Sequence, residues 1–301
     1  MRGRRLRKRQ LKGSARKWIH TSKSKTAYLF LAPSLLGTLL FWLIPFADVI
    51  RRSFFQAVGN TFVGLTNYRN VLRNEAFVQA VSHTVRFLAI CLPLLMVISF
   101  LLAILLYELP RWRSFYEALY LIPMAIPVAS VVVFWKLTFD RKGLLNELLH
   151  LFNLSGQDWM NTGYAFGVLV FSYIWRNVGY DVILWVAGLS GIPKEQYEAA
   201  KVSGAGKIQC FWYITLPQMK DSVAMIGVLS FVNAFRVFRE AYLIAGDYPH
   251  HSIYMLQHVF NNWFTKLDIQ KMSAGAVMMS VVVSILMILV EVWNDRQGRD
   301  R

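Results

Sequence analysis

The sequence has little charge for its length and lacks the residue groups that build most enzyme sites. Charged residues make up 17% of its 301 residues, against 55% hydrophobic residues. It holds two cysteines, Cys91 and Cys210, and neither these nor the six histidines fall into a cluster with metal-ligand spacing. The phosphate-binding pattern G-x-x-x-x-G-K-[ST] does not occur. We therefore expect no catalytic residues, no metal and no bound cofactor in this chain, and a composition this apolar argues against a soluble protein.

The apolar residues gather in long blocks. Four stretches, 27–47, 87–107, 118–137 and 272–291, are almost free of charge. A helix needs about 20 residues to cross the hydrocarbon layer of a membrane, and each block reaches about that length. These blocks predict four transmembrane helices.

Two further apolar stretches, 164–188 and 222–246, have the right length but contain ionisable side chains. A charge at membrane depth is costly unless it faces protein or water, so these helices are expected to line the interior of a bundle. The prediction is an all-α integral membrane protein with six transmembrane helices. The ionisable residues are Arg176, Asp181, Arg236, Arg239 and Glu240.

Basic residues outside the spans predict the orientation. One side of the six-span topology carries 20 of them and the other side 9. Because positively charged loops stay in the cytoplasm, the arm 1–26, the loop 189–221 and the tail 294–301 are predicted to be cytoplasmic, with a membrane domain over 27–293. A basic arm beside a first span suits anionic lipid headgroups better than nucleic acid, and no nucleic-acid partner is expected.

The loop 189–221 predicts two short helices joined by a glycine turn. Pro193 suits a first helical turn, and Gly204 or Gly206 can supply the left-handed residue that ends the helix. A second helix is expected to run until Pro217. Composition leaves two interpretations about even: an interfacial hairpin that only connects two spans, or a helix that docks in a groove of another protein.

The spacing of seven residues in this loop decides between them. They resemble the EAA loop of permease subunits of binding-protein-dependent ABC importers at every position. The resemblance implies that an acidic residue anchors the first helix in a groove of a separate ATPase, that two alanines pack there, that a glycine makes the turn, and that three later residues fix the second helix to the bundle. In that order, the residues are Glu198, Ala199, Ala200, Gly204, Ile214, Leu216 and Pro217.

The resemblance covers nearly the whole chain. FLAPSLLGTLLFWLIPFADVIRRSFF, FVGLTNYRNVLRNEAFVQAVSHT and LYLIPMAIPVASVVVFWKLTFDRKGLLNELL resemble the first span, the external segment after it and the proline-rich third span of the carbohydrate-uptake branch, the MalF/UgpA-like sugar permeases. FRVFREAYLIAG resembles the fifth span of that branch. The Gly-Gly-Pro-like turn that follows it there reads Gly246-Asp247-Tyr248-Pro249 in this chain, which is a departure from the pattern.

Membership of that branch would imply a permease that forms half of a translocation pathway in the bacterial plasma (inner) membrane. Its partners would be a second homologous permease subunit, a cytoplasmic ABC ATPase dimer that holds ATP and Mg, an extracellular solute-binding protein, a sugar substrate and membrane lipid. This chain would be a transport subunit and not an enzyme.

Polar residues of the two charged spans are candidates for the pathway or its gate. Arg236 and Glu240 are four residues apart and can pair on one helix face, and Asp181 can partner Arg239. Amides and aromatic hydroxyls suit the hydroxyl-rich surface of a sugar. The alternative is that the charges only brace the helices. The candidates are Arg176, Asn177, Tyr180, Asp181, Asn233, Arg236, Arg239, Glu240 and Tyr242.

Two other function classes compete with this interpretation. A standalone secondary transporter or channel could have six spans, but it would have no need of a docking helix for an ATPase. An intramembrane serine protease is suggested by the short pattern Gly188-Leu189-Ser190-Gly191. A serine nucleophile needs a base within hydrogen-bond reach, and the histidines of this chain are predicted to lie far from Ser190.

Overall fold

The computed structural model describes residues 28–109, 111–234, 241 and 249–299. These residues are almost entirely helical, and the β-structure among them is one isolated antiparallel bridge between Phe55 and Phe62. The helices are η1 (Leu39–Leu43), α2 (Ile44–Ser53), α3 (Thr66–Leu72), α4 (Glu75–Tyr107), α5 (Arg113–Ala125), α6 (Val128–Phe139), α7 (Leu144–Leu151), α8 (Tyr164–Ser190), α9 (Lys194–Val202), α10 (Lys207–Cys210), η2 (Phe211–Thr215), α11 (Leu216–Gln218), α12 (Lys220–Ala234), η4 (His251–Ile253), α14 (Leu256–Thr265) and α15 (Ile269–Arg299).

Three helices of the described residues are long and apolar enough to cross a membrane: Tyr28–Ser53, Glu75–Tyr107 and Ile269–Val292. The bent pair Arg113–Ala125 and Val128–Leu151 adds a fourth if it counts as one span. Helix α8 coincides closely with the predicted fourth span. The predicted fifth span corresponds to α12 up to Ala234, and most of its second half lies outside the described residues.

Helix α4 begins well before the predicted second span. The apolar block starts at Phe87, but the helix starts at Glu75, where the side chain of Asn74 accepts a hydrogen bond from the N–H of Phe77 (3.0 Å). This N-cap stabilises the polar first turns of the helix. Arg86 lies on these turns and places its guanidinium over the ring of Phe166 at 4.7 Å from the centroid.

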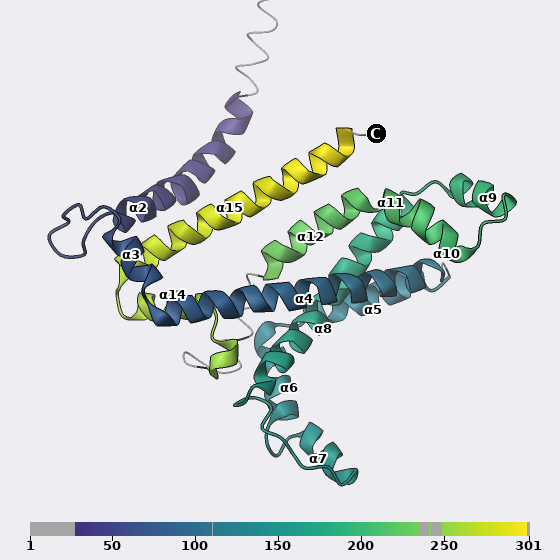
Figure 1. Cartoon of the computed structure of the whole chain (residues 1–301), viewed down its shortest axis with the longest axis horizontal. Helices are drawn as coiled ribbons and strands as arrows, with labels where there is room; N and C mark the ends of the chain where they lie inside the picture. The colour runs from purple at the N-terminus through teal and green to yellow at the C-terminus, as the bar shows by residue number, and fades with distance from the viewer. Residues whose placement is uncertain (1–27, 110, 235–240, 242–248, 300–301) are drawn as a thin grey trace, which may run out of the picture.

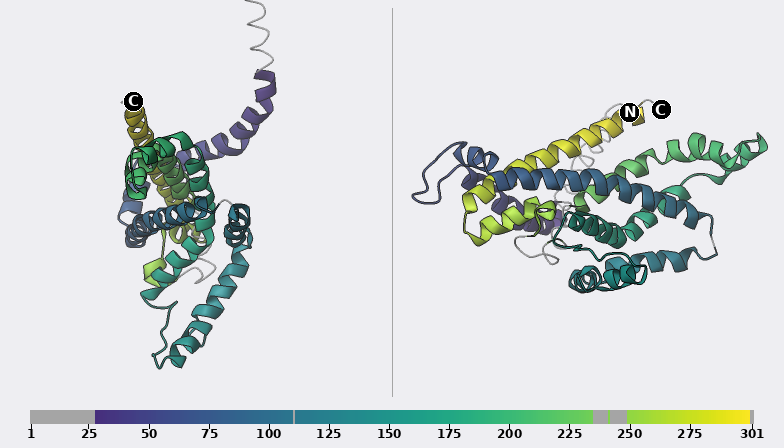
Figure 2. Two further views of the ribbon diagram at one scale, coloured as in Figure 1. Left: turned by 90° about the vertical axis from the view of Figure 1, so that its right-hand side faces the viewer. Right: turned by 60° about the horizontal axis from the view of Figure 1, so that its bottom comes forward.

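The predicted third span is not one straight helix. Helix α5 ends at Ala125 and α6 begins at Val128, with a bend of 85° between them. Pro127 has no N–H to donate and restricts the residue before it, so Ile126 takes an extended conformation (φ −69°, ψ 133°). Figures 1 and 2 show that α6 and α7 consequently project away from the other helices.

Helix α8 is at the centre of the packing, against α4, α5 and α12 (Figure 1). Trp185 on α8 donates a buried hydrogen bond to Ser99 on α4 (2.9 Å). Gly179 lets the backbones of α8 and α5 meet, because a Cβ at this position would lie 1.9 Å from the carbonyl oxygen of Tyr120. A larger residue at 179 would force the two helices apart.

The two ends of the helical bundle differ in construction. At one end α3, α4, α14 and α15 enclose a small core in which the rings of Phe77 and Trp263 stack at 5.8 Å. At the other end lie the short helices α9 and α10 (Figure 1). The described chain leaves the apolar part of the first helix uncovered, although α2 and α15 are in contact.

The contact at Gly179 gives a stability prediction with a control on the same helix. Gly179→Ala should destabilise the protein by about 1–3 kcal/mol, because the methyl group would overlap backbone atoms that cannot yield cheaply. At Gly167 a Cβ would meet nothing within 4 Å. Gly167→Ala should therefore leave the melting temperature of the detergent-purified protein unchanged or slightly raised. Equal melting temperatures for the two variants would contradict this account of the α5–α8 contact.

Candidate functional site

The hairpin of residues 189–221 continues directly from α8. Helix α8 ends at Ser190, Ile192 is buried, and Pro193 serves as the N-cap of α9 in an extended conformation. The sequence predicted Pro193 inside the first turn, and the structure places it one residue earlier. Three residues therefore separate the two helices, so the position of α9 is tied closely to the end of α8.

A glycine turn ends α9. Gly204 has φ +84°, and its N–H donates to the carbonyl of Lys201 (3.0 Å). The next N–H, of Ala205, donates to the carbonyl of Ala200 (2.9 Å). This pair of bonds is a Schellman motif, which satisfies the free carbonyls of the last helical turn and requires a left-handed residue. Of the two predicted glycines, Gly204 takes this role; Gly206 instead caps the start of α10, with φ −77°.

The second arm of the hairpin contains a wide turn before its proline. After α10 the chain forms the π-helical turn η2, closed by a bond from the N–H of Leu216 to the carbonyl of Phe211. Pro217 cannot donate to the preceding turn, and a π turn accommodates that loss. The hydroxyls of Tyr197 and Thr215 bond at 2.8 Å and join the two arms. Ile214 packs against the core cluster of α4, α8 and α12.

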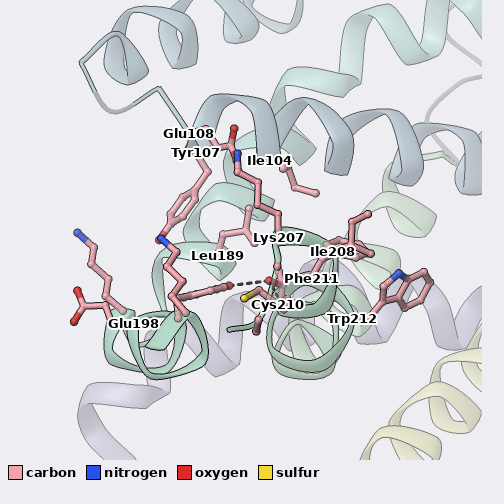
Figure 3. Close-up of a pocket in the computed structure, with 16 residues that line it drawn as sticks. Ile104, Tyr107, Glu108, Leu189, Glu198, Lys207, Ile208, Cys210, Phe211 and Trp212 are labelled. Atoms are coloured by element: carbon pink, nitrogen blue, oxygen red, sulfur yellow. Dashed lines mark hydrogen bonds and ion pairs between the residues drawn. The ribbon is translucent and has the colours of Figure 1, made fainter. Parts of the chain in front are cut away.

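The EAA residues of α9 lie at the surface. Glu198 and Ala199 are exposed and Ala200 is half-buried. Figure 3 shows the carboxylate of Glu198 turned away from Leu189 and Phe211. Within the described part of the chain no hydrogen bond or ion pair holds this carboxylate. Leu216 and Pro217, by contrast, are half-buried at the base of the hairpin.

The charged residues of α8 that can be described both have partners on other elements. Arg176 donates to the carbonyls of Ile126 (3.0 Å) and Met124 (3.4 Å), at the break between α5 and α6. Asp181, 1% exposed, accepts a hydrogen bond from the hydroxyl of Ser230 on α12 (2.8 Å). Ser230 was not among the predicted site residues, although a serine within the apolar run 222–234 is a polar group that needs a partner.

The remaining pathway candidates that the structure describes show no hydrogen bond to another helix. Asn177 donates to the carbonyl of Tyr173 in its own helix (2.8 Å), and Tyr180 and Asn233 are half-buried. The proposed pairing of Asp181 with Arg239 cannot be followed, because that arginine lies outside the described residues. The same holds for the rest of the fifth-span set: Arg236, Glu240 and Tyr242.

Comparison with known proteins now identifies the chain. Residues 76–300 match the family described as "Binding-protein-dependent transport system inner membrane component". The chain belongs to this family. It is 29% identical to the "Probable ABC transporter permease protein YurN" of Bacillus subtilis (strain 168), over 91% of this chain and 97% of the relative. It is 34% identical to the "Arabinooligosaccharides transport system permease protein AraP" of the same strain, over 74% of this chain and 73% of the relative.

A solved structure supports the same fold. The chain matches a subunit in the crystal structure of a bacterial ABC transporter involved in the import of the acidic polysaccharide alginate, with a TM-score of 0.83, over 93% of this chain and 99% of that one, at 19% identity. The family match over residues 76–300 and the two relatives confirm the predicted family, and the chain is a multi-pass membrane permease of an ABC importer. Family membership disfavours the standalone transporter.

The geometry of Ser190 is at odds with the protease alternative. Its hydroxyl donates to the carbonyl of Val186 (2.7 Å) and accepts a bond from the guanidinium of Arg113 (3.2 Å). Among the described residues no histidine bonds to it. In the permease, Ser190 joins the start of α5 to the end of α8.

Sequence analysis also missed Asn146, which organises the loop between α7 and α8. Its amide donates to the carbonyls of Asp140, Arg141 and Gln157 and accepts bonds from the N–H of Gln157 and the indole of Trp159, at 2.8–3.2 Å. Every hydrogen-bonding atom of this buried side chain is satisfied. Nothing in the sequence distinguishes it from a polar surface residue of α7.

The turn at Gly204 predicts a local effect with a matched control. Gly204→Ala should strain the hairpin by about 1–2 kcal/mol, because an L-residue is disfavoured at positive φ. Gly206→Ala should be tolerated, since Gly206 has a negative φ and its Cβ would lie 3.9 Å from the nearest atom. Faster tryptic cleavage at Lys201 or Lys207 of the purified Gly204→Ala protein would reveal the strain. Identical digestion of both variants would contradict it.

Proposed function

We propose that this permease forms half of the translocation pathway of an ATP-driven importer for a sugar or oligosaccharide, and that α9 couples it to a separate ATPase. The observation that carries the proposal is the exposed Glu198-Ala199 face of α9, at the tip of a hairpin that continues directly from α8. ATP and Mg are assigned to the ATPase, and no cofactor is assigned to this chain.

The composition of α9 suits docking into a groove. Alanines at 199 and 200 keep the helix narrow, so its backbone can approach the groove walls closely. Glu198 supplies one exposed charge for a basic residue of the ATPase. Such a charge contributes mainly to orientation and to the choice of partner.

The hairpin is built to transmit movement. Its two arms are joined by the Tyr197–Thr215 bond and its base is buried through Ile192 and Ile214 against the bundle. A displacement of α9 therefore acts on the end of α8. Helix α8 carries Arg176 and Asp181, whose partners lie on the α5–α6 break and on α12.

A sugar is the favoured substrate because the names of relatives include sugars, as in the arabinooligosaccharides transport system permease. Asn177, Tyr180, Asn233 and Tyr242 offer amide and hydroxyl groups at membrane depth, which suit a neutral, hydroxyl-rich solute. The charged candidates Arg176, Asp181, Arg236, Arg239 and Glu240 are assigned to the gate or to bracing of the pathway.

The full assembly has six spans in this chain, the fifth over about 222–246, with both termini and the hairpin in the cytoplasm of a bacterial cell. The excess of basic residues on that side supports this orientation. A second homologous permease completes the pathway, an ATPase dimer binds on the cytoplasmic side, and an extracellular binding protein delivers the solute.

Charge reversal on α9 tests the coupling. Glu198→Lys should reduce both recovery of the ATPase with the solubilised permease and ATP-dependent sugar uptake, by roughly tenfold or more, because like charges would meet in the groove. Glu195→Lys is the control: it makes the same change on the same helix, at an exposed position outside the EAA residues. Membrane insertion should be normal in both.

The outcome is read as a difference between the two variants. Loss of ATPase recovery in Glu198→Lys alone supports docking through the EAA face. Undiminished recovery and uptake in Glu198→Lys, or an equal loss in Glu195→Lys, would remove the assigned role of Glu198.

A further inference from the structure

A large cavity opens on the inner side of the hairpin. It has a volume of about 910 Å³ and lies between the end of α4, helix α9 and the α10–η2 arm (Figure 3). Ile104, Leu189 and Phe211 form an apolar wall. The lining also includes the side chains of Tyr107, Tyr197 and Trp212. The cavity is thus mostly apolar and open at one side.

The position of this cavity corresponds to a membrane surface. Tyr107 is the last residue of α4, a 33-residue helix that is apolar enough to cross a bilayer. Trp212 and Tyr213 follow on the adjacent arm and are 59% and 81% exposed, and Ile208 is 75% exposed. Exposed aromatic residues beside the end of a spanning helix are typical of the level where lipid headgroups meet acyl chains.

The rim of the cavity carries an excess of positive charge. Lys194, Lys201 and Lys207 line it, against Glu108 and Glu198. Lys207 and Glu108 neutralise each other at 3.3 Å. The carboxylate of Glu198 points away from the apolar wall in Figure 3. Lys194 and Lys201 have no ion-pair partner among the residues that the structure describes.

We propose that this cavity binds an anionic phospholipid of the cytoplasmic leaflet. The phosphate of the lipid lies at Lys194 and Lys201, and one of its acyl chains lies along Ile104, Leu189 and Phe211. The proposal rests on the cytoplasmic position that the proposed function gives to the hairpin. A lysine near an anionic membrane surface is attracted to it, and the apolar wall removes the acyl chain from water.

Other occupants fit less well. A free phosphate ion would leave the apolar wall without a partner. A zwitterionic lipid carries a phosphate but no net negative charge, so it would leave the excess positive charge of the rim in place. The basic N-terminal arm, residues 1–26, would place like charge against the same lysines. A single anionic lipid satisfies both the charge and the apolar surface.

A lipid in this place would touch both α4 and α9. It would therefore stabilise the hairpin against the bundle in the membrane-bound protein, and the coupling element would depend on the lipid composition of the inner leaflet. This would be a regulatory contact beside the EAA residues, because Glu198 also lines the cavity.

The test measures lipid retained by the permease purified with its partner subunits. Native mass spectrometry should find phosphatidylglycerol bound in preference to phosphatidylcholine when both are offered in equal amounts. The double variant Lys194→Gln/Lys201→Gln should retain roughly tenfold less phosphatidylglycerol, because both ammonium groups near the headgroup are lost. The control variant Lys142→Gln/Lys266→Gln removes the same charge away from the cavity, between α6 and α7 and at the end of α14, and should behave as the parent.

Three results would overturn the proposal. These are equal retention of the two lipids by the parent, equal phosphatidylglycerol retention by the two double variants, or displacement of the lipid by millimolar inorganic phosphate, which would indicate a free-anion site. ATPase recovery is measured on the same samples. Its absence from the parent would count against the proposed coupling function, whereas the lipid measurements decide the cavity separately.

Discussion

A polar group inside a bilayer has no water to bond to, so it must find its partner on another part of the protein. Helix α8, the predicted fourth span, carries two ionisable side chains that meet this constraint. Arg176 bonds to carbonyls that the α5–α6 break exposes, and Asp181 bonds to Ser230 of α12. These bonds, with the backbone contact at Gly179, hold α5, the α5–α6 break and α12 to α8. The arrangement of the described helices depends on α8 for this reason.

The same helix leads into the hairpin. Helix α8 therefore connects the proposed pathway residues to the proposed ATPase contact on α9. The Schellman turn at Gly204 and the Tyr197–Thr215 bond make the hairpin a compact unit, and Ile192 anchors its start. Movement imposed on the EAA face would reach the partners of Arg176 and Asp181 through one continuous helix. A lipid in the cavity between α4 and the hairpin would contact the same unit.

Much of the helical pattern could be predicted from the sequence because it depends on local properties. The length of the apolar run 164–188 is close to that of α8, and the glycines at 204 and 206 mark the turn of the hairpin. The break at Pro127 could be anticipated as a kink. Its size of 85° could not, because it depends on how α6 and α7 pack and on the carbonyls that Arg176 takes up.

Contacts between distant residues were harder to predict. The partner of Asp181 is Ser230, 49 residues away, and a serine in an apolar run gives no sign of its partner. Asn146 looks like a surface residue and is instead the buried centre of a loop. Helix α4 exceeds its apolar block by the polar turns from Glu75, because the Asn74 cap and the Arg86–Phe166 contact stabilise them. Such features depend on tertiary packing.

The central claim is that the outer face of α9 contacts the ATPase. It is tested most directly by cross-linking from Ala199→Cys in membranes that contain the whole transporter, with Asn70→Cys on α3 at the other end of the bundle as the comparison. A short thiol-reactive cross-linker should join position 199 to the ATPase subunit and leave position 70 without that adduct. Absence of the adduct at 199, or its formation from position 70, would contradict the account.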